Sequence, residues 1–280
     1  MSTTNNLRHI WLCADDYGIA PGVNAAIRNL IVRGRINATS VMVVAPSFNR
    51  SEALPLNMLN SGSRRVAIGL HLVLTGPYKP LTQKFSPLRR GAFLPLGGAL
   101  FAATMRRYRQ EPLRVEIATQ LAAFTTAFGH PPDFIDGHQH VHLFPQIRDA
   151  VLSVVKSVAP TVWVRQCGRA PEARRRGDRK AAVLDRLSDR FLRRAEALGV
   201  KTNPAFAGTY DFGGRVEFAT LFARFLDELP DQGLVMCHPG FPDKELIGID
   251  PLTFQRQREY DFLAGDRFIE VLEMQGATLR

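Results

Sequence analysis

The sequence predicts an α/β fold of the (β/α)-barrel type: a single TIM-like domain, seven-stranded or otherwise distorted. Short apolar runs alternate with segments of helical periodicity about seven times, which is typical of parallel strands covered by helices. No glycine-rich phosphate loop follows the first apolar run, so a doubly wound nucleotide-binding sheet fits less well. Polar residues end several of the apolar runs, where a barrel carries its active site.

The individual elements follow from the pattern in order. Short apolar runs predict strands at 10–14, 40–45, 66–74, 133–137, 161–165, 233–237 and 277–280. Helical periodicity or polar spacing predicts helices over 21–34, after residue 45, and over 112–128, 145–158, 180–198, 216–228, 252–263 and 266–274. Residues 76–100 are rich in Pro and Gly, and we expect a loop or insertion over about 76–110. We therefore expect one domain spanning 1–280.

Composition narrows the class of protein. The chain has 280 residues, of which 45% are hydrophobic and 22% charged, as in ordinary globular enzymes. No apolar run approaches the ~20 residues of a membrane span, and the N-terminus lacks a signal-peptide pattern, so we expect a cytoplasmic protein. The three cysteines are far apart with no CxxC, which argues against a disulfide framework and a cysteine zinc site.

Polar clusters end four of the apolar runs. The first run ends in "ADDYG" with Asp15 and Asp16, and a later one carries His71 in "GLHLVLTG". Another ends in "DGHQHVH", beginning at His138, and the last in "MCHPG" with His238. One such residue would be unremarkable, but four in equivalent places are hard to bury in a core because buried charge is costly. We therefore predict an active site at the carboxyl ends of the strands.

Carboxylate and imidazole groups without thiolates suit a divalent metal in an open site. Side chains alternate along an extended chain, so one aspartate of the pair can bind metal while its neighbour acts as a base. Taken alone, the pair would more simply be a capped helix start.

Three histidines follow one another in the fourth cluster. His138 is the first choice for a ligand, with Asp136 as the partner that orients its imidazole. We assign His140 and His142 to the pocket lining as substrate-binding residues, although either could be a further ligand. Arg165, at the end of the next strand, joins this substrate-binding set.

These motifs resemble a known family. "ADDYGIAPGVNAAI", "GLHLVLTG", "DGHQHVHLFPQI" and "MCHPGF" are similar, in order and spacing, to the motifs of the YdjC-like carbohydrate deacetylases, which include chitooligosaccharide deacetylase. The resemblance implies a barrel-like fold and hydrolytic removal of acetyl from an N-acetylated amino sugar. It implies one divalent metal, Mg²⁺ or alternatively Zn²⁺, held by Asp16, His71 and His138. It also implies Asp15 as the base and, by analogy with other polysaccharide deacetylases, His238 as the acid.

The chain is more basic than we expect of an enzyme that acts on an uncharged sugar. The net charge is +10, and arginines are dense over 165–194. A solvated helix face is one interpretation; the other is attraction to an anionic partner, because some family members are associated with hopanoid or other lipid-linked sugars. We therefore predict an acetylated amino-sugar substrate, no nucleic acid and a peripheral contact with anionic membranes. A homodimer is compatible with the sequence.

Two other functions fit parts of the pattern. A metal-dependent phosphoesterase would need a second metal ~3.5–4 Å from the first, with His140 and His142 as added ligands. A non-catalytic module that binds glycans or anionic surfaces would not need Asp15 and His238.

Overall fold

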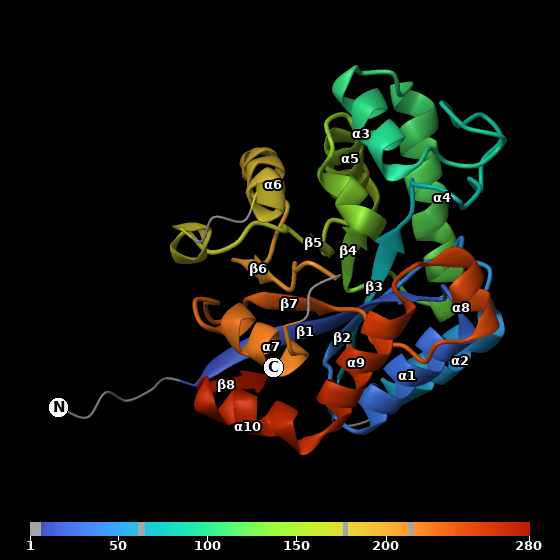
Figure 1. Ribbon diagram of the computed structural model, residues 1–280. Helices are drawn as coiled ribbons and strands as arrows, with labels where there is room; N and C mark the ends of the chain where they lie inside the picture. Colours follow the sequence, from blue (N-terminus) through green and yellow to red (C-terminus); the bar gives the residue numbers. More distant parts are fainter. Residues whose placement is uncertain (1–6, 61–64, 176–178, 213–215) are drawn as a thin grey trace.

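A single curled sheet forms the centre of the molecule (Figure 1). The computed structural model describes residues 7–60, 65–175, 179–212 and 216–280. The strands run in the order β5-β4-β3-β2-β1-β7-β6, all paired in parallel, and β8 pairs with the start of β1. Their bounds are β1 Arg8–Tyr17, β2 Ala38–Val41, β3 Ala67–Leu72, β4 Phe134–Gly137, β5 Trp163–Val164, β6 Phe206–Ala207, β7 Leu234–Cys237 and β8 Ala277–Leu279.

The sheet is an incompletely closed barrel, which confirms the predicted fold class. Among the described residues no strand ladder joins the edge strands β5 and β6. Two backbone hydrogen bonds cross the gap, from Val164 N to Lys201 O at 2.9 Å and from Phe206 N to Gly168 O at 3.0 Å. Between them the Asn203 amide bonds to the Gln166 backbone: its Oδ1 accepts from Gln166 N at 2.8 Å and its Nδ2 donates to Gln166 O at 3.2 Å. A side chain thus supplements sparse backbone pairing where the barrel is distorted.

Helices surround the outer side of the sheet (Figure 1). Helix α5 shows why: Ile147, Val151 and Val154 fall on one face and are buried, as the helical period requires. The other helices follow the same logic, with bounds α1 Pro21–Val32, α2 Arg50–Leu59, α3 Leu96–Thr104, α4 Gln110–Phe128, α5 Ile147–Val158, α6 Arg179–Leu198, α7 Phe218–Leu226, α8 Lys244–Ile249, α9 Thr253–Ala264 and α10 Asp266–Met274. Two 3₁₀ helices, η1 (His138–Leu143) and η2 (Glu172–Arg175), follow β4 and β5. None of the described helices has the length and apolarity that crossing a bilayer requires.

Three elements differ from the sequence-based expectation. Residues 76–110 are not a plain loop, because α3 forms within them and buries Ala99 and Ala102 despite two glycines in its first turn. The strand β6 has only two residues, too few to give an apolar run. The short helix α8 begins at an Asp243 cap and was not predicted.

The strand order brings the four polar clusters together. Because the strands are parallel, their carboxyl ends share one edge of the sheet, and β1 lies next to β7 while β3 lies next to β4. The register pairs Ala14 with Cys237 and His71 with Asp136. Residues separated by more than 200 positions therefore meet at one site.

Candidate active site

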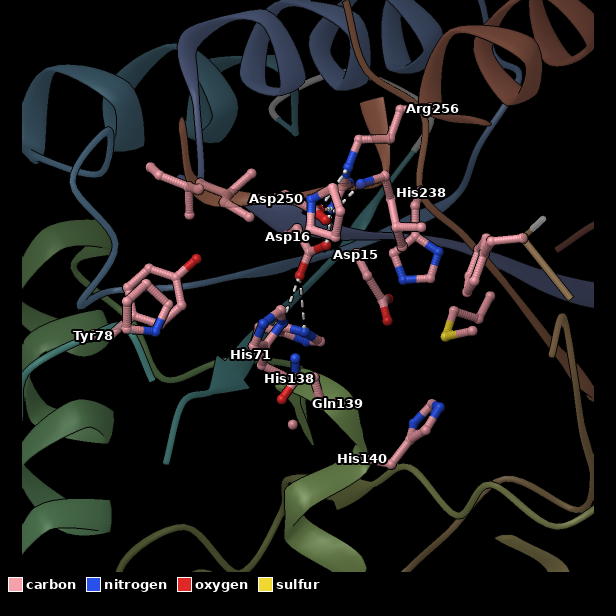
Figure 2. Close-up of a pocket in the computed structure, with 18 of the residues that line it drawn as sticks. Asp15, Asp16, His71, Tyr78, His138, Gln139, His140, His238, Asp250 and Arg256 are labelled. Carbon is pink, nitrogen blue, oxygen red and sulfur yellow. Dashed lines mark hydrogen bonds and ion pairs between the residues drawn. The ribbon is translucent and has the colours of Figure 1, made fainter. Parts of the chain in front are cut away.

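Three predicted ligands converge on one oxygen atom. The Oδ1 of Asp16 lies 3.3 Å from Nε2 of His71 and 3.0 Å from Nδ1 of His138 (Figure 2). One ligand atom from each of the three residues lies within 4.8 Å of the others. Asp16 and His71 are buried, and His138 is partly open to the pocket. The arrangement offers a cation one carboxylate oxygen and two imidazole nitrogens.

A bulge at the end of β1 turns the two aspartates toward different partners. Asp16 has a left-handed backbone (φ 70°), and the β1–β2 register shifts between Ala14 and Tyr17. Such backbone conformations cost energy in a residue other than glycine and concentrate at functional sites. As a result Asp15 and Asp16 both line one pocket, yet they contact different groups.

Asp15 is held by a buried arginine. Arg165 Nη1 donates to Asp15 Oδ1 at 2.8 Å and Nη2 to Oδ2 at 2.7 Å, a two-pronged pairing between fully buried groups. The same Nη2 lies 3.0 Å from Asp136 Oδ2. Cys13, Asp15 and Asp136 also form a cluster of potential metal ligands, but the Arg165 guanidinium already supplies the positive charge between the two carboxylates.

Asp136 orients a different histidine from the one predicted. It lies 2.6 Å from Nδ1 of His71, not against His138. This contact leaves Nε2 of His71 directed at Asp16, the pattern by which outer carboxylates fix metal-binding imidazoles. The cross-strand register of His71 with Asp136 explains the pairing.

The carboxylates of the site are held ionised. Burial opposes the ionisation of Asp15, but Arg165 and His71 outweigh it and keep the pKa of this carboxyl well below its usual range. Burial also opposes the ionisation of Asp16, whose pKa is nevertheless held low, with Arg256 the largest contributor. Both side chains are therefore negatively charged at neutral pH.

The histidines differ in their electrostatic surroundings. Burial lowers the pKa of His71, but Asp136 outweighs it and raises the pKa to about 10. Burial, reinforced by Arg165, lowers the pKa of His140 to about 3 and that of His142 well below its usual value. The cluster around His71 thus attracts positive charge, whereas His140 and His142 stay neutral.

Two residues predicted to bind substrate do not face the pocket. His142 and Arg165 are fully buried beneath it, and His142 Nε2 donates to the Arg165 carbonyl at 2.8 Å. The left-handed residues Gln139 and His140 interrupt the alternation on which the prediction depended. The structure therefore does not support a substrate-binding role for His142 or Arg165. His140 does line the pocket, beside the Cys167 thiol at 3.5 Å and apart from the His71–His138 pair (Figure 2).

His238 also lines the pocket, on the other side of Asp15 from His71 and His138 (Figure 2). Its backbone N–H donates to Glu259 at 2.5 Å, and Glu259 also accepts from the Tyr210 hydroxyl at 2.6 Å. The Nδ1 atom of His238 is buried and has no hydrogen-bond partner among the described residues. The backbone of the loop is thus fixed while the imidazole is left available.

Sequence reasoning missed the pair Arg256 and Asp250. Both line the pocket, and Arg256 Nη2 donates to Asp16 Oδ2 at 2.6 Å and to Asp250 Oδ2. Arg256 is among the most deeply buried large side chains. Its neighbours in "FQRQREYDF" read as a solvated helix face, so the sequence holds no signal that singles it out.

The pocket is small, with a volume of about 210 Å³. This is below the roughly 300–1,000 Å³ of sites that enclose drug-sized ligands, so it accommodates one end of a larger substrate. Tyr78 and Phe212 form part of its wall. The Tyr78 ring meets the His138 ring edge-on at 5.9 Å, and Phe212 meets His238 at 5.8 Å.

The basic segment 165–194 is less free than its composition suggested. Arg169 lies 2.7 Å from Asp185, and Arg174 lies 2.8 Å from Asp189. Residues 176–178 lie outside the described part of the chain. Where the exposure of this segment is described, its exposed arginines lie on α6: Arg186, Arg190, Arg193 and Arg194.

Proteins similar in sequence to this chain align with it over most of its length. A chitooligosaccharide deacetylase of Escherichia fergusonii is 29% identical over 255 residues, covering 89% of this chain and 88% of the relative. A second, from Proteus mirabilis, is 28% identical over 271 residues, covering 95% and 94%.

Solved structures share the fold. A protein from Enterococcus faecalis assigned to cellobiose-phosphate cleavage superposes with a TM-score of 0.77 at 21% identity, covering 98% of this chain and 97% of that one. A peptidoglycan N-acetylglucosamine deacetylase superposes with a TM-score of 0.51 at 13% identity, covering 99% and 86%. The model of the YdjC-like proteins matches residues 9–274, and the chain belongs to this family.

Proposed function

We propose that this protein is a metal-dependent carbohydrate deacetylase, one domain that removes acetyl groups from an N-acetylated amino sugar. The observation that carries the proposal is the convergence of His71 and His138 on one oxygen of Asp16, beside an ionised Asp15. The chitooligosaccharide deacetylases among the relatives support the substrate class.

The charges of the pocket support one divalent cation. Binding a metal requires neutral imidazoles, so His71 gives up the proton that it otherwise holds. The four carboxylates and two guanidiniums of the ion-pair network then carry a charge of minus two (Asp15, Asp16, Asp136 and Asp250 with Arg165 and Arg256). One divalent ion balances this charge in a buried setting where an unbalanced charge is costly. A second ion would not be balanced, and His140 and His142 do not join the cluster. The two-metal phosphoesterase therefore finds no support among the described residues.

The chain's residues divide the chemistry of amide hydrolysis between them. When bound at Asp16, His71 and His138, the metal supplies Lewis-acid polarisation of the acetyl carbonyl and lowers the pKa of water. Asp15 accepts the proton of the attacking water, and Arg165 keeps it ionised. Oδ1 of Asp15 accepts from Arg165, Ser40 and Cys13, whereas among the described residues Oδ2 accepts a hydrogen bond from Arg165 alone, so Oδ2 is the oxygen available to the water. His238 donates a proton to the leaving amine. The products are acetate and a free amino sugar.

The ligand set suits more than one metal. Two imidazoles and one carboxylate are typical of Zn²⁺, whereas the family resemblance implies Mg²⁺. Removing metal with a chelator should abolish activity, and adding back each ion separately identifies the one that restores it.

The direct test is acetate release from a panel of N-acetylated amino sugars, including chitobiose and longer oligomers. A phosphomonoester and an O-acetylated sugar serve as controls. We expect acetate from at least one N-acetylated sugar, with release abolished by a chelator. Phosphate release without acetate release would overturn the proposal.

A further inference from the structure

Arg256 approaches Asp16 from the side opposite the histidines (Figure 2). Its Nη2 donates to Oδ2 of Asp16 at 2.6 Å, while Oδ1 of the same carboxylate faces His71 and His138. Arg256 and Asp16 are both almost fully buried, so water does not compete for this contact. The two oxygens of Asp16 therefore have different partners.

Asp250 fixes the position of this guanidinium. Arg256 Nε donates to Asp250 Oδ2 at 3.1 Å, and Nη2 bridges Oδ2 of Asp250 and Oδ2 of Asp16. Asp250 immediately follows α8 and Arg256 lies in α9, so the two are joined through a short turn. The carboxylate–guanidinium–carboxylate arrangement holds Arg256 from both sides and balances its charge.

This arrangement limits how Asp16 can bind a cation. A free carboxylate can offer both oxygens to one ion and so fill two coordination positions. The charge-assisted hydrogen bond from Arg256 holds Oδ2 against the guanidinium, whose positive charge opposes a second metal bond from this oxygen and leaves Oδ1 as the ligand atom. A catalytic metal site requires an open position, and a second Asp16 oxygen would fill one.

We infer that Arg256 is a positioning residue that restricts Asp16 to a single ligand oxygen, with Asp250 holding it in place. The inference rests on the proposed metal site and adds to it the element that keeps a coordination position open. Arg256 lines the pocket, but the role inferred for it acts through Asp16.

The two members of the pair should affect metal binding in opposite directions. Arg256→Gln releases Oδ2 and removes a positive charge beside the cation, so the affinity for metal should rise by about tenfold. Its kcat should nevertheless fall by roughly 10–100-fold, the usual effect of losing a group that orients a ligand, with little change in KM. Asp250→Asn leaves the Arg256 charge less balanced, so the affinity for metal should fall.

The measurement is metal titration of wild type, Arg256→Gln and Asp250→Asn, together with the visible spectrum of each protein loaded with Co²⁺. A second oxygen from Asp16 raises the coordination number, and the Co²⁺ absorption should weaken accordingly in Arg256→Gln. Arg258→Gln is the matched control, because Arg258 lies on the same helix but does not line the pocket; it donates to Val216 O and lies over the Phe254 ring. It should leave affinity, spectrum and kcat unchanged.

A purely structural role predicts a different result. If Arg256→Gln and Asp250→Asn both weaken metal binding, or if the Co²⁺ spectrum of Arg256→Gln matches wild type, the inference is wrong. Should Arg256→Gln not fold, Arg256→Lys takes its place, since it keeps the charge but not the fork of donors. A weaker Co²⁺ absorption and lower kcat are then expected, and wild-type values for both overturn the inference. A wild-type protein that neither binds metal nor releases acetate would refute the proposed function itself.

Discussion

The buried arginines of the pocket and the exposed arginines of α6 carry the same charge in opposite settings. Arg165 and Arg256 are almost fully buried, and each lies between two carboxylates. Arg190 and Arg193 face solvent, where charges are screened over about 8 Å at physiological ionic strength. Removing one partner of a buried ion pair leaves an uncompensated buried charge, which strongly destabilises the fold. A surface ion pair contributes only about 0–1 kcal/mol to the free energy of unfolding.

The difference shows that arginine density along the sequence does not mark the arginines that shape the site. In the dense segment some arginines form ion pairs with acidic residues of the same segment, as Arg169 does with Asp185, and others lie on an exposed helix face. Of the two arginines in the pocket network, Arg165 lies at the edge of that segment and Arg256 lies far outside it. Four predictions test whether the burial and partners of an arginine, and not the local density of arginines, decide its effect on stability and activity.

The largest loss of activity should come from replacing a metal ligand of the buried site. His71→Ala removes a ligand from the Asp16 cluster, so bound metal should fall sharply and acetate release should be abolished. Metal content by mass spectrometry and acetate release measure the two effects. Full turnover with one metal per chain in this variant would mean that the ligand set is different.

Replacing a buried arginine should destabilise the fold where replacing an exposed one does not. Arg165→Gln leaves Asp15 and Asp136 buried without their counter-charge, so we expect a loss of about 3–5 kcal/mol in the free energy of unfolding. The matched control, Arg190→Gln on α6, should change it by no more than about 0.5 kcal/mol. Denaturant unfolding measures both, and equal losses would contradict the comparison.

His238 tests the chemistry that the buried charges serve. His238→Ala should lower kcat on an N-acetylated sugar by ~10²–10⁴-fold, because the amine leaves poorly without a proton. An acetyl ester with a nitrophenol leaving group needs no such proton, so its hydrolysis should fall far less. Equal losses on both substrates would show that His238 is not the acid.

The smallest effect should come from the α6 surface. We propose that its arginines attract anionic membranes, with about 1 kcal/mol per basic residue near the surface. Replacing Arg190, Arg193 and Arg194 with Ser should reduce co-sedimentation with anionic vesicles at low salt and leave kcat on soluble sugars unchanged. Neutral vesicles and high salt are the controls. Binding that is negligible in every condition would leave α6 an ordinary solvated face.

Much of the site could be predicted because its residues end apolar runs. These residues lie in the last positions of strands or directly after them, and the parallel order of the strands brings them together (Asp15, Asp16, His71, His138 and His238). Their roles remain predictions, but their meeting in one pocket follows from the topology.

The rest depended on conformation and long-range contact. The left-handed Gln139 and His140 turn His142 into the interior, and no spacing rule reports such residues. Asp136 pairs with His71 through strand register, which the sequence does not give. Arg256 contacts Asp16 across 240 positions from a helix whose sequence reads as ordinary surface, and Asp250, which follows α8, contacts Arg256.

The double aspartate tests the central claim most directly, because it separates metal binding from proton transfer in adjacent residues. Metal content and acetate release should be measured side by side for Asp15→Asn and Asp16→Asn. We predict that Asp15→Asn retains one metal per chain and loses ~10²–10⁴-fold in kcat, whereas Asp16→Asn loses the metal and the activity together. Metal retained in Asp16→Asn and lost in Asp15→Asn would contradict the account.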